Sequence, residues 1–320
     1  MNHACYLPSP TLSEYVAWYL LSEDTDTHAN WQESTVLPNG LSALVFSYGA
    51  SFKCVTGLQK QRTIRSVSIL GPHTKPCRNW WKEPTFTFII VFKPLGLFKL
   101  LGGNLNELKN DVIDLADYGF SDSSWMCEKL AQLTSAHAKI AWVEHWLRVH
   151  LAGSTYRPSL TADFLQYVID RLGKVCVESI VQNMNVNRRY LERQFNLQLG
   201  MSPKDYAETI RFSYIASKLA KTQQAQWPEL TYLGDFYDQS HFIKHFRKHS
   251  NISPGQFRKI ITQSKKIRFL SQMNIYNDSE IDRRNNYIVI AEKTDNPANK
   301  CRTFTMGCPR VSATLDTMEI

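Results

Sequence analysis

Apolar and polar residues alternate in short runs through the first hundred residues and recur at helical spacing through much of the remaining chain. Four runs have the period of β-strands: residues 35–49, 52–58, 62–71 and 85–94. In the last run, period two places four apolar side chains on one face: Phe86, Phe88, Ile90 and Phe92. Pro38-Asn39-Gly40 is a turn signal, and Lys60-Gln61 lies between two runs as a hairpin tip. These short antiparallel strands predict a small barrel or sandwich.

Aromatic residues on and beside these strands leave two interpretations open. They either line a pocket for a small ligand or form ordinary core, which is the commoner role of such a stripe. The residues concerned are Trp80, Trp81, Phe86, Phe88 and Phe92.

Residues 124–151 change to a helical pattern, in which apolar side chains such as Leu130, Ile140, Val143 and Leu147 recur near helical spacing. An amphipathic pair of helices at this place has two roles that the sequence does not separate. The pair could hold two copies of the chain together as a homodimer, or it could pack against the strands that precede it. Residues 153–159 then have the composition of a linker.

One helical pattern occurs twice between residues 177 and 259, first at 177–195 and again at 230–246. Each copy has a short apolar helix, a tight turn, a capping Asn or Asp, and a second helix crowded with polar and basic side chains. This is the pattern of a helix-turn-helix, whose second helix lies in the major groove of DNA. Two copies joined by one long helix resemble the DNA-binding domain of the AraC/XylS family of transcription regulators. The most specific part of the resemblance is residues 236–259, FYDQSHFIKHFRKHSNISPGQFRK.

The turns and caps of the two copies occupy matching positions. Asn187 and Asp238 are placed as N-caps, whose side-chain oxygen accepts an exposed backbone N–H of the following helix. Asn185 and Asp235 stand in the turns where the family usually has Gly. Asn and Asp are the other residues that visit the left-handed region most readily, and we expect strain of about 1 kcal/mol at Asp235. Arg211 corresponds to a basic residue that the family places on the connecting helix, and we favour a structural role for it.

The residues that follow each cap and point outward are the candidate DNA contacts. They are Arg188, Arg189, Glu192 and Arg193 in the first copy, and Gln239, Ser240, His241, Lys244, Arg247 and Lys248 in the second. Arg can pair bidentately with guanine and Gln with adenine, while Glu accepts from the cytosine amine. By motif position, Arg189, Glu192 and Arg193 match base-reading and backbone-contacting residues of the family. The alternative for Glu192 is an ion pair with Arg188 on the same helix, worth only tenths of a kcal/mol.

Net charge supports a nucleic-acid partner for the repeated segment. Residues 1–155 carry 13 Lys and Arg against 13 Asp and Glu, and residues 269–320 carry 6 against 7. Residues 156–268 carry 18 against 9, a net charge of +9, so the whole excess of +8 in the chain lies there. A basic face of this kind neutralises phosphates and releases counterions.

Histidine and cysteine patterns bear on two competing functions. A cupin-type enzyme needs two or three converging His, but only His73 falls among the predicted strands, since His3 and His28 are expected in loops and three others on later helices. A DNA-repair protein with alkyl-transfer chemistry would need a reactive Cys, and Cys176 stands alone before the first copy. His241, His245 and His249 recur every four residues, but without a carboxylate at matching spacing we expect surface or phosphate-contacting histidines rather than a metal site. We therefore expect no cofactor, no metal and no catalytic residues.

The expected fold is α+β with two domains, and the resemblance supplies its interpretation. Residues 1–152 resemble the cupin-like β-barrel sensor or dimerisation domain that many family members carry, and residues 160–268 form the all-α DNA-binding domain. Residues 269–320 are expected to be a disordered tail. The resemblance implies promoter DNA, a small-molecule effector and RNA polymerase as partners. Seven scattered cysteines without C-x-x-C, and no signal-peptide pattern, favour the cytoplasm and no membrane partner.

Overall fold

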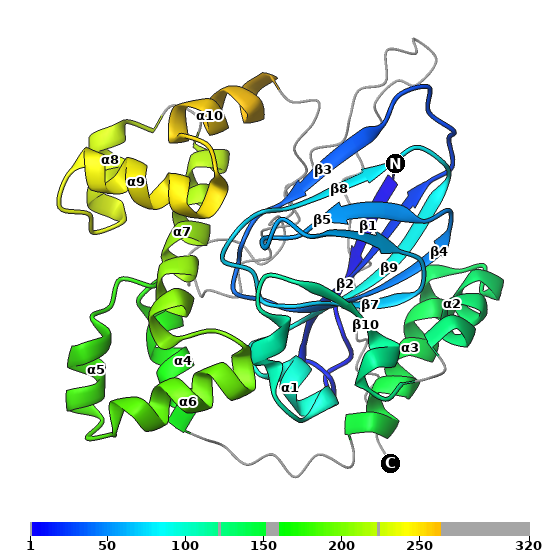
Figure 1. Ribbon diagram of the computed structural model, residues 1–320, viewed down its shortest axis with the longest axis horizontal. Helices are drawn as coiled ribbons and strands as arrows, with labels where there is room; N and C mark the ends of the chain where they lie inside the picture. Colours follow the sequence, from blue (N-terminus) through cyan, green and yellow to red (C-terminus); the bar gives the residue numbers. More distant parts are fainter. Residues whose placement is uncertain (1, 121–122, 152–159, 223–224, 264–320) are drawn as a thin grey trace, which may run out of the picture.

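The computed structural model describes residues 2–120, 123–151, 160–222 and 225–263. The expected linker at 153–159 and the expected tail at 269–320 lie outside these residues. A strand-rich N-terminal part is followed by an all-helical C-terminal part, as the sequence predicts (Figure 1). None of the helices in the described ranges is long and apolar enough to cross a membrane.

In the described residues of the N-terminal part, ten strands form two antiparallel sheets. The larger sheet has the order β1-β2-β9-β4-β7-β10 and the smaller one the order β3-β8-β5-β6, so within the described residues the strands make an open sandwich rather than a closed barrel. The bounds are β1 Asn2–Tyr6, β2 Val16–Asp24, β3 Gln32–Val36, β4 Ala43–Gly49, β5 Phe52–Val55, β6 Gln61–Ile64, β7 Val67–Leu70, β8 Cys77–Trp81, β9 Thr85–Phe92 and β10 Val112–Asp114.

Two predictions about these strands need correction. The run at 62–71 is two strands, β6 and β7, which lie in different sheets. His3 was expected in a loop but lies in β1, which pairs antiparallel with β2. The turn at Pro38-Asn39-Gly40 is confirmed, with Gly40 at a φ of 77° between β3 and β4.

Strand β9 separates two apolar environments because its side chains alternate between the faces of the larger sheet. Phe88, Ile90 and Phe92 are fully buried on one face, in the core shared with the helices α2 (Ser123–Gln132) and α3 (Ala136–Leu151). The core interpretation of Phe88 and Phe92 is therefore confirmed.

Helices α2 and α3 pack against their own sheet, which was one of the two roles left open. Met126, Cys127 and Leu130 of α2, with Val143 and Leu147 of α3, belong to the same buried core as β9. The apolar stripe of this helix pair therefore packs against the sheet of its own chain. A homodimer through α2 and α3 stays a prediction.

The C-terminal part consists of seven helices within the described residues. They are α4 Leu160–Asp170, α5 Val177–Asn183, α6 Arg188–Leu199, α7 Pro203–Lys221, α8 Trp227–Leu233, α9 Gln239–Ser250 and α10 Pro254–Gln263. One core joins α4, α5 and α6 to the first half of α7, and a second joins α8, α9 and α10 to its second half. Helix α7 thus connects two similar units, with the N-terminal sandwich lying beside it (Figure 1).

Candidate nucleic-acid interface

The first helix-turn-helix unit is α5 and α6 with the turn between them. Asn185 in that turn has a φ of 48°, as expected for a left-handed position. The side chain of Asn187 accepts a hydrogen bond from the backbone N–H of Tyr190 at 3.1 Å, which confirms the predicted cap. A polar cap fixes where α6 begins, so the residues after it are presented in a defined rotation about the helix axis.

The second unit, α8 and α9, repeats this construction. Asp235 has a φ of 54°, and the side chain of Asp238 accepts from the backbone N–H of His241 at 2.7 Å. The guanidinium of Arg211, on α7, donates to the carbonyl oxygens of Gly234 and Asp235 and lies 4.0 Å from the ring centre of Phe236. Arg211 therefore holds the strained turn in place, which is the structural role favoured from the sequence.

Most predicted contact residues on α6 point to solvent. Arg188, Arg189 and Arg193 are exposed, and Glu192 is half-buried. Arg188 makes ion pairs with Glu192 at 3.0 Å and with Glu178 at 3.1 Å, so the intrahelical pair exists in the free protein. Tyr190, which was expected to face inward or pack along the side, is 46% exposed.

The predicted contact residues on α9 also point outward, and one of them, near the end of the helix, is held in an ion pair. Gln239, Ser240, His241, Lys244, Arg247 and Lys248 are all exposed. The ammonium of Lys248, however, forms an ion pair with Glu208 of α7. The expectation that His245 and His249 lie on the surface or contact phosphate is wrong, because only 8% and 1% of their surfaces are exposed.

Sequence reasoning missed one exposed aromatic residue beside this surface. Tyr237 directly precedes the cap of α9 and is 94% exposed. Tyr hydroxyls commonly bind phosphate oxygens next to a recognition helix. The sequence did contain a signal for this contact. Tyr237 is a large aromatic residue immediately before the N-cap, at a position where the motif does not require one.

The second helices of both units begin away from the N-terminal sandwich and end against it (Figure 1). At the end of α6, a Cβ on Gly200 would meet the backbone oxygen of Leu105. At the end of α9, the Nδ1 atom of His249 lies 3.1 Å from the carbonyl oxygen of Thr74. The first turns of α6 and α9 are therefore the parts left open to a partner.

The N-terminal sandwich encloses a pocket between its two sheets. The cavity volume of the pocket is about 130 Å³. Its lining includes Ile89 and Val91, from the face of β9 opposite the buried phenylalanines, and Trp81, but not Trp80, Phe86, Phe88 or Phe92. Among the described residues that line it none is Asp, Glu, Lys or Arg. Burial lowers the pKa of His73 in the wall to about 4, so that ring is neutral near pH 7.

Two segments of the pocket wall also touch the helical part. Leu37 lines the pocket and belongs to the core formed around Phe212. Asn39 lines the pocket, and a Cβ on the next residue, Gly40, would lie 2.9 Å from Ile210 of α7. His73 lines the pocket next to Thr74, the residue whose carbonyl meets His249. Each of these wall residues therefore either packs with α7 itself or directly precedes a residue that contacts α7 or α9.

Comparisons with known proteins match these two parts separately. Residues 180–260 match a family described as a helix-turn-helix domain, and residues 4–114 match a domain of unknown function (DUF6597). The chain is 30% identical over 122 residues to the HTH-type transcriptional regulator MtrA of Neisseria gonorrhoeae, which covers 37% of this chain and 40% of that protein. It is 32% identical over 84 residues to the lactose operon transcription activator of Staphylococcus xylosus, covering 26% and 30%.

The matches span less than half the length of either relative. Among solved structures, ToxT from Vibrio cholerae with a bound unsaturated fatty acid gives a TM-score of 0.43 at 15% identity, over 78% of this chain and 97% of that one. Residues 180–260 of this chain thus form an AraC-type helix-turn-helix domain, which follows an N-terminal domain of the DUF6597 family.

Proposed function

We propose that this protein is a sequence-specific DNA-binding regulator of transcription. The observation that carries the proposal is the pair of capped helices, α6 and α9, whose first turns expose Arg188, Arg189, Gln239 and Ser240. Early residues of a recognition helix meet base edges, whereas later ones reach the phosphate backbone. The net charge of +9 on residues 156–268 supplies the long-range attraction to phosphates.

The proposed contacts keep the residues expected from the sequence and divide them by role. Arg189, Glu192, Gln239 and Ser240 read bases, while Arg193, Lys244 and Arg247 contact phosphates, joined by Tyr237. Arg188, His241 and Lys248 complete the interface once the ion pairs of Arg188 and Lys248 are exchanged for phosphate. The proposed partners are promoter DNA and RNA polymerase, in the cytoplasm. Activation is the favoured mode, because the relative from Staphylococcus xylosus is named as a transcription activator.

The test selects duplex sequences that bind the full-length chain and measures their affinity against random duplex. We expect the double variant Arg189→Ala, Gln239→Ala to lose this preference, since each lost bidentate contact costs about 1–3 kcal/mol of discrimination. Lys129→Ala, which removes one positive charge from α2 in the other domain, is the control. Selection that recovers no preferred sequence would refute the proposal.

We further propose that the N-terminal pocket binds a neutral, apolar small molecule and that this binding adjusts DNA affinity. An apolar wall without a charged residue would leave a buried carboxylate or ammonium unpaired, which is costly. The wall segments at 37–41 and 71–75 touch α7 and α9, so they offer a direct route from the pocket to the recognition helices. The relatives are transcriptional regulators, and we assign the pocket no catalytic role.

A neutral apolar fluorophore, N-phenyl-1-naphthylamine, can report on the pocket directly. We expect its fluorescence to rise with the wild-type chain and not with Val91→Trp, whose larger side chain occupies the space between the sheets. Palmitate should compete weakly because its carboxylate finds no cation in the described wall. Equal fluorescence with both proteins would show that the fluorophore binds elsewhere.

A further inference from the structure

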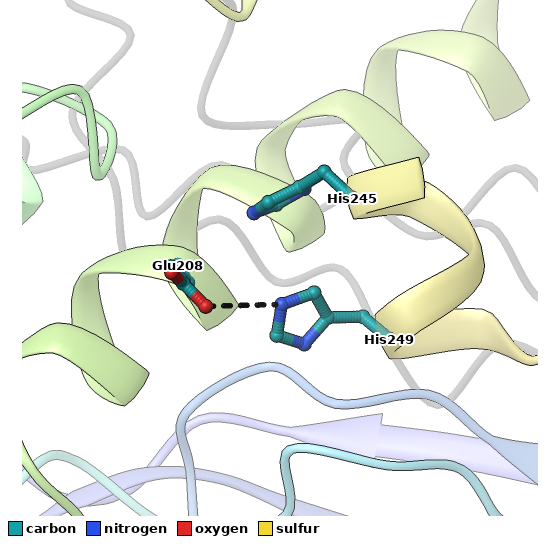
Figure 2. A group of neighbouring side chains, drawn as sticks. All are labelled: Glu208, His245 and His249. Carbon is teal, nitrogen blue, oxygen red and sulfur yellow. Dashed lines mark ion pairs between the residues drawn. The ribbon is translucent and has the colours of Figure 1, made fainter. Parts of the chain in front are cut away.

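Three side chains from two helices converge beside the N-terminal sandwich, as Figure 2 shows. Glu208 comes from α7, and His245 and His249 come from successive turns of α9. One possible ligand atom from each residue lies within 4.8 Å of the other two. The sequence places no carboxylate at a matching distance from these histidines along the chain. The fold supplies one by crossing α7 over α9.

Hydrogen bonding orients His249 in the way expected of a metal ligand. Its Nδ1 atom lies 3.1 Å from the carbonyl oxygen of Thr74, and only a protonated nitrogen can bond to a carbonyl. Nδ1 therefore carries the proton, and Nε2 presents a lone pair. That lone pair lies 3.9 Å from a carboxylate oxygen of Glu208 (Figure 2). Metal-bound histidines commonly donate their second ring N–H to a backbone carbonyl in this manner.

The two histidines also carry buried nitrogen atoms that lack a partner. Among the described residues, Nε2 of His245 and Nε2 of His249 have no hydrogen-bond partner. Their side chains are buried, and buried polar atoms in folded proteins are nearly always bonded to something. An unprotonated ring nitrogen is the atom with which histidine binds a metal.

Positively charged groups surround the cluster, so one of them has to move away when a metal cation binds. Lys248 forms an ion pair with Glu208, and Arg211 and Lys75 also bear on the two rings. The side chain of Lys248 is 48% exposed, so its ammonium can turn to solvent and leave Glu208 to the metal. Tetrahedral zinc with ligands near 2.0–2.1 Å requires ligand atoms about 3.3 Å apart. Zinc binding would therefore draw the ligand atoms together through rotations about the side-chain bonds of Glu208 and of the two histidines.

We propose that Glu208, His245 and His249 bind one Zn²⁺ ion, with water at the fourth position. Two histidines and one glutamate form a known zinc ligand set that leaves one position open. The ion would join α7 to the last turns of α9 and, through Thr74, to the wall segment at 71–75. It would also release Lys248 from Glu208.

The experiment titrates Zn²⁺ into tag-free, chelator-stripped, full-length protein in competition with a chromophoric chelator. We expect one equivalent to bind to the wild type, with affinity reduced at least tenfold in Glu208→Gln and in His249→Ala. His241→Ala is the matched control, since that residue is exposed on the same helix, and it should bind as the wild type does. Circular dichroism checks that each variant is folded, and Glu208→Gln, being half-exposed and isosteric, keeps the test valid if His249→Ala is not.

Two further readouts separate this site from cysteine sites and from a structural effect. Lys248→Met should tighten zinc binding, because it removes the cation that competes for Glu208. Co²⁺ in place of Zn²⁺ should give ligand-field bands without a thiolate-to-cobalt charge-transfer band. Zinc uptake that is absent, that is unchanged in Glu208→Gln, or that shows the thiolate band would overturn the proposal.

Discussion

Mild acid should destabilise this protein because three histidines are buried in the neutral state. Burial lowers the pKa of His73 and His249 to about 4 and that of His245 to about 2, against about 6.5 for histidine in an unfolded chain. Between pH 6.5 and 4 the unfolded chain therefore binds more protons than the folded one. The contribution of these histidines to the free energy of unfolding is therefore complete above pH 6.5, and it is lost as the pH is lowered through this window.

The surroundings of each ring keep this direction. His249 faces Lys248 and Lys75, which lower its pKa further, and Glu208 and the Thr74 carbonyl, which raise it by less than burial lowers it. His245 faces His249, Arg211, Lys248 and His241, all of which lower its pKa. The Gly71 carbonyl, hydrogen-bonded to His73, and the nearby Asp111 raise the pKa of that ring, again by less than burial lowers it. Carboxylates with lowered pKa, such as Asp24 and Asp205, lose their contribution only at lower pH.

The size of this loss in unfolding free energy depends on how many more protons the unfolded chain binds than the folded one. Each pH unit below 6.5 costs about 1.4 kcal/mol per histidine that remains neutral when folded. From pH 7.5 to 5.0 the loss is therefore about 2 kcal/mol per ring and about 6 kcal/mol for three. This is a large share of the roughly 5–15 kcal/mol that stabilises a typical domain.

The assay is urea unfolding at pH 7.5 and 5.0 with a chelator present, followed by tryptophan fluorescence. His249→Asn keeps a donor for the Thr74 carbonyl but cannot be protonated, so its loss between the two pH values should be about 2 kcal/mol smaller than that of the wild type. His241→Asn, at an exposed position, should lose as much as the wild type. Equal losses in all three proteins would mean that the burial of His249 does not cause the acid sensitivity.

Three further outcomes are expected. Asp238→Ala should lower the free energy of unfolding by about 1 kcal/mol in urea, with Asp238→Asn as a control that still caps α9. In binding isotherms on single-base variants of a selected site, Arg189→Ala should relax the preference at particular base pairs, whereas Arg247→Ala should weaken all sequences alike and reduce the salt slope by about one unit. Val91→Trp should abolish any change in DNA affinity that an apolar ligand produces in the wild type. Its DNA affinity without ligand should stay within about twofold of the wild-type value. Loss of DNA binding in the absence of ligand would mean that Val91 is needed for folding rather than for the response to the ligand.

The parts of the structure that local chemistry determines were predictable from the sequence. The caps at Asn187 and Asp238 bond to backbone groups three residues away, so their geometry depends on the adjacent chain alone. The turns at Asn185 and Asp235 are equally local, since a left-handed backbone favours these residue types. Exposure of the first turns of α6 and α9 is then a consequence of the helical period.

Features that depend on distant packing were not predictable. The burial of His245 and His249 requires knowing that α7 crosses α9 and that Thr74 comes from the other domain. The sequence left the aromatic residues open between pocket and core, and period two on β9 places Phe88 in the helix-covered core and Ile89 in the pocket. Which face of a two-sided apolar strand meets helices and which meets another sheet is decided by topology. The residue pattern is the same in either case.

Footprinting of the full-length chain on a selected duplex is the sharpest test of DNA recognition by two helices. Helix α7 has 19 residues and is about 28 Å long, so it holds the two recognition helices at a fixed separation. Successive major grooves on one face of the duplex are about 34 Å apart, which α6 and α9 can span with their own side chains. We expect two protected base clusters spaced by roughly 10 bp. A single cluster would show that only one helix-turn-helix unit docks, and protection that is the same on random duplex would show that neither unit reads the sequence.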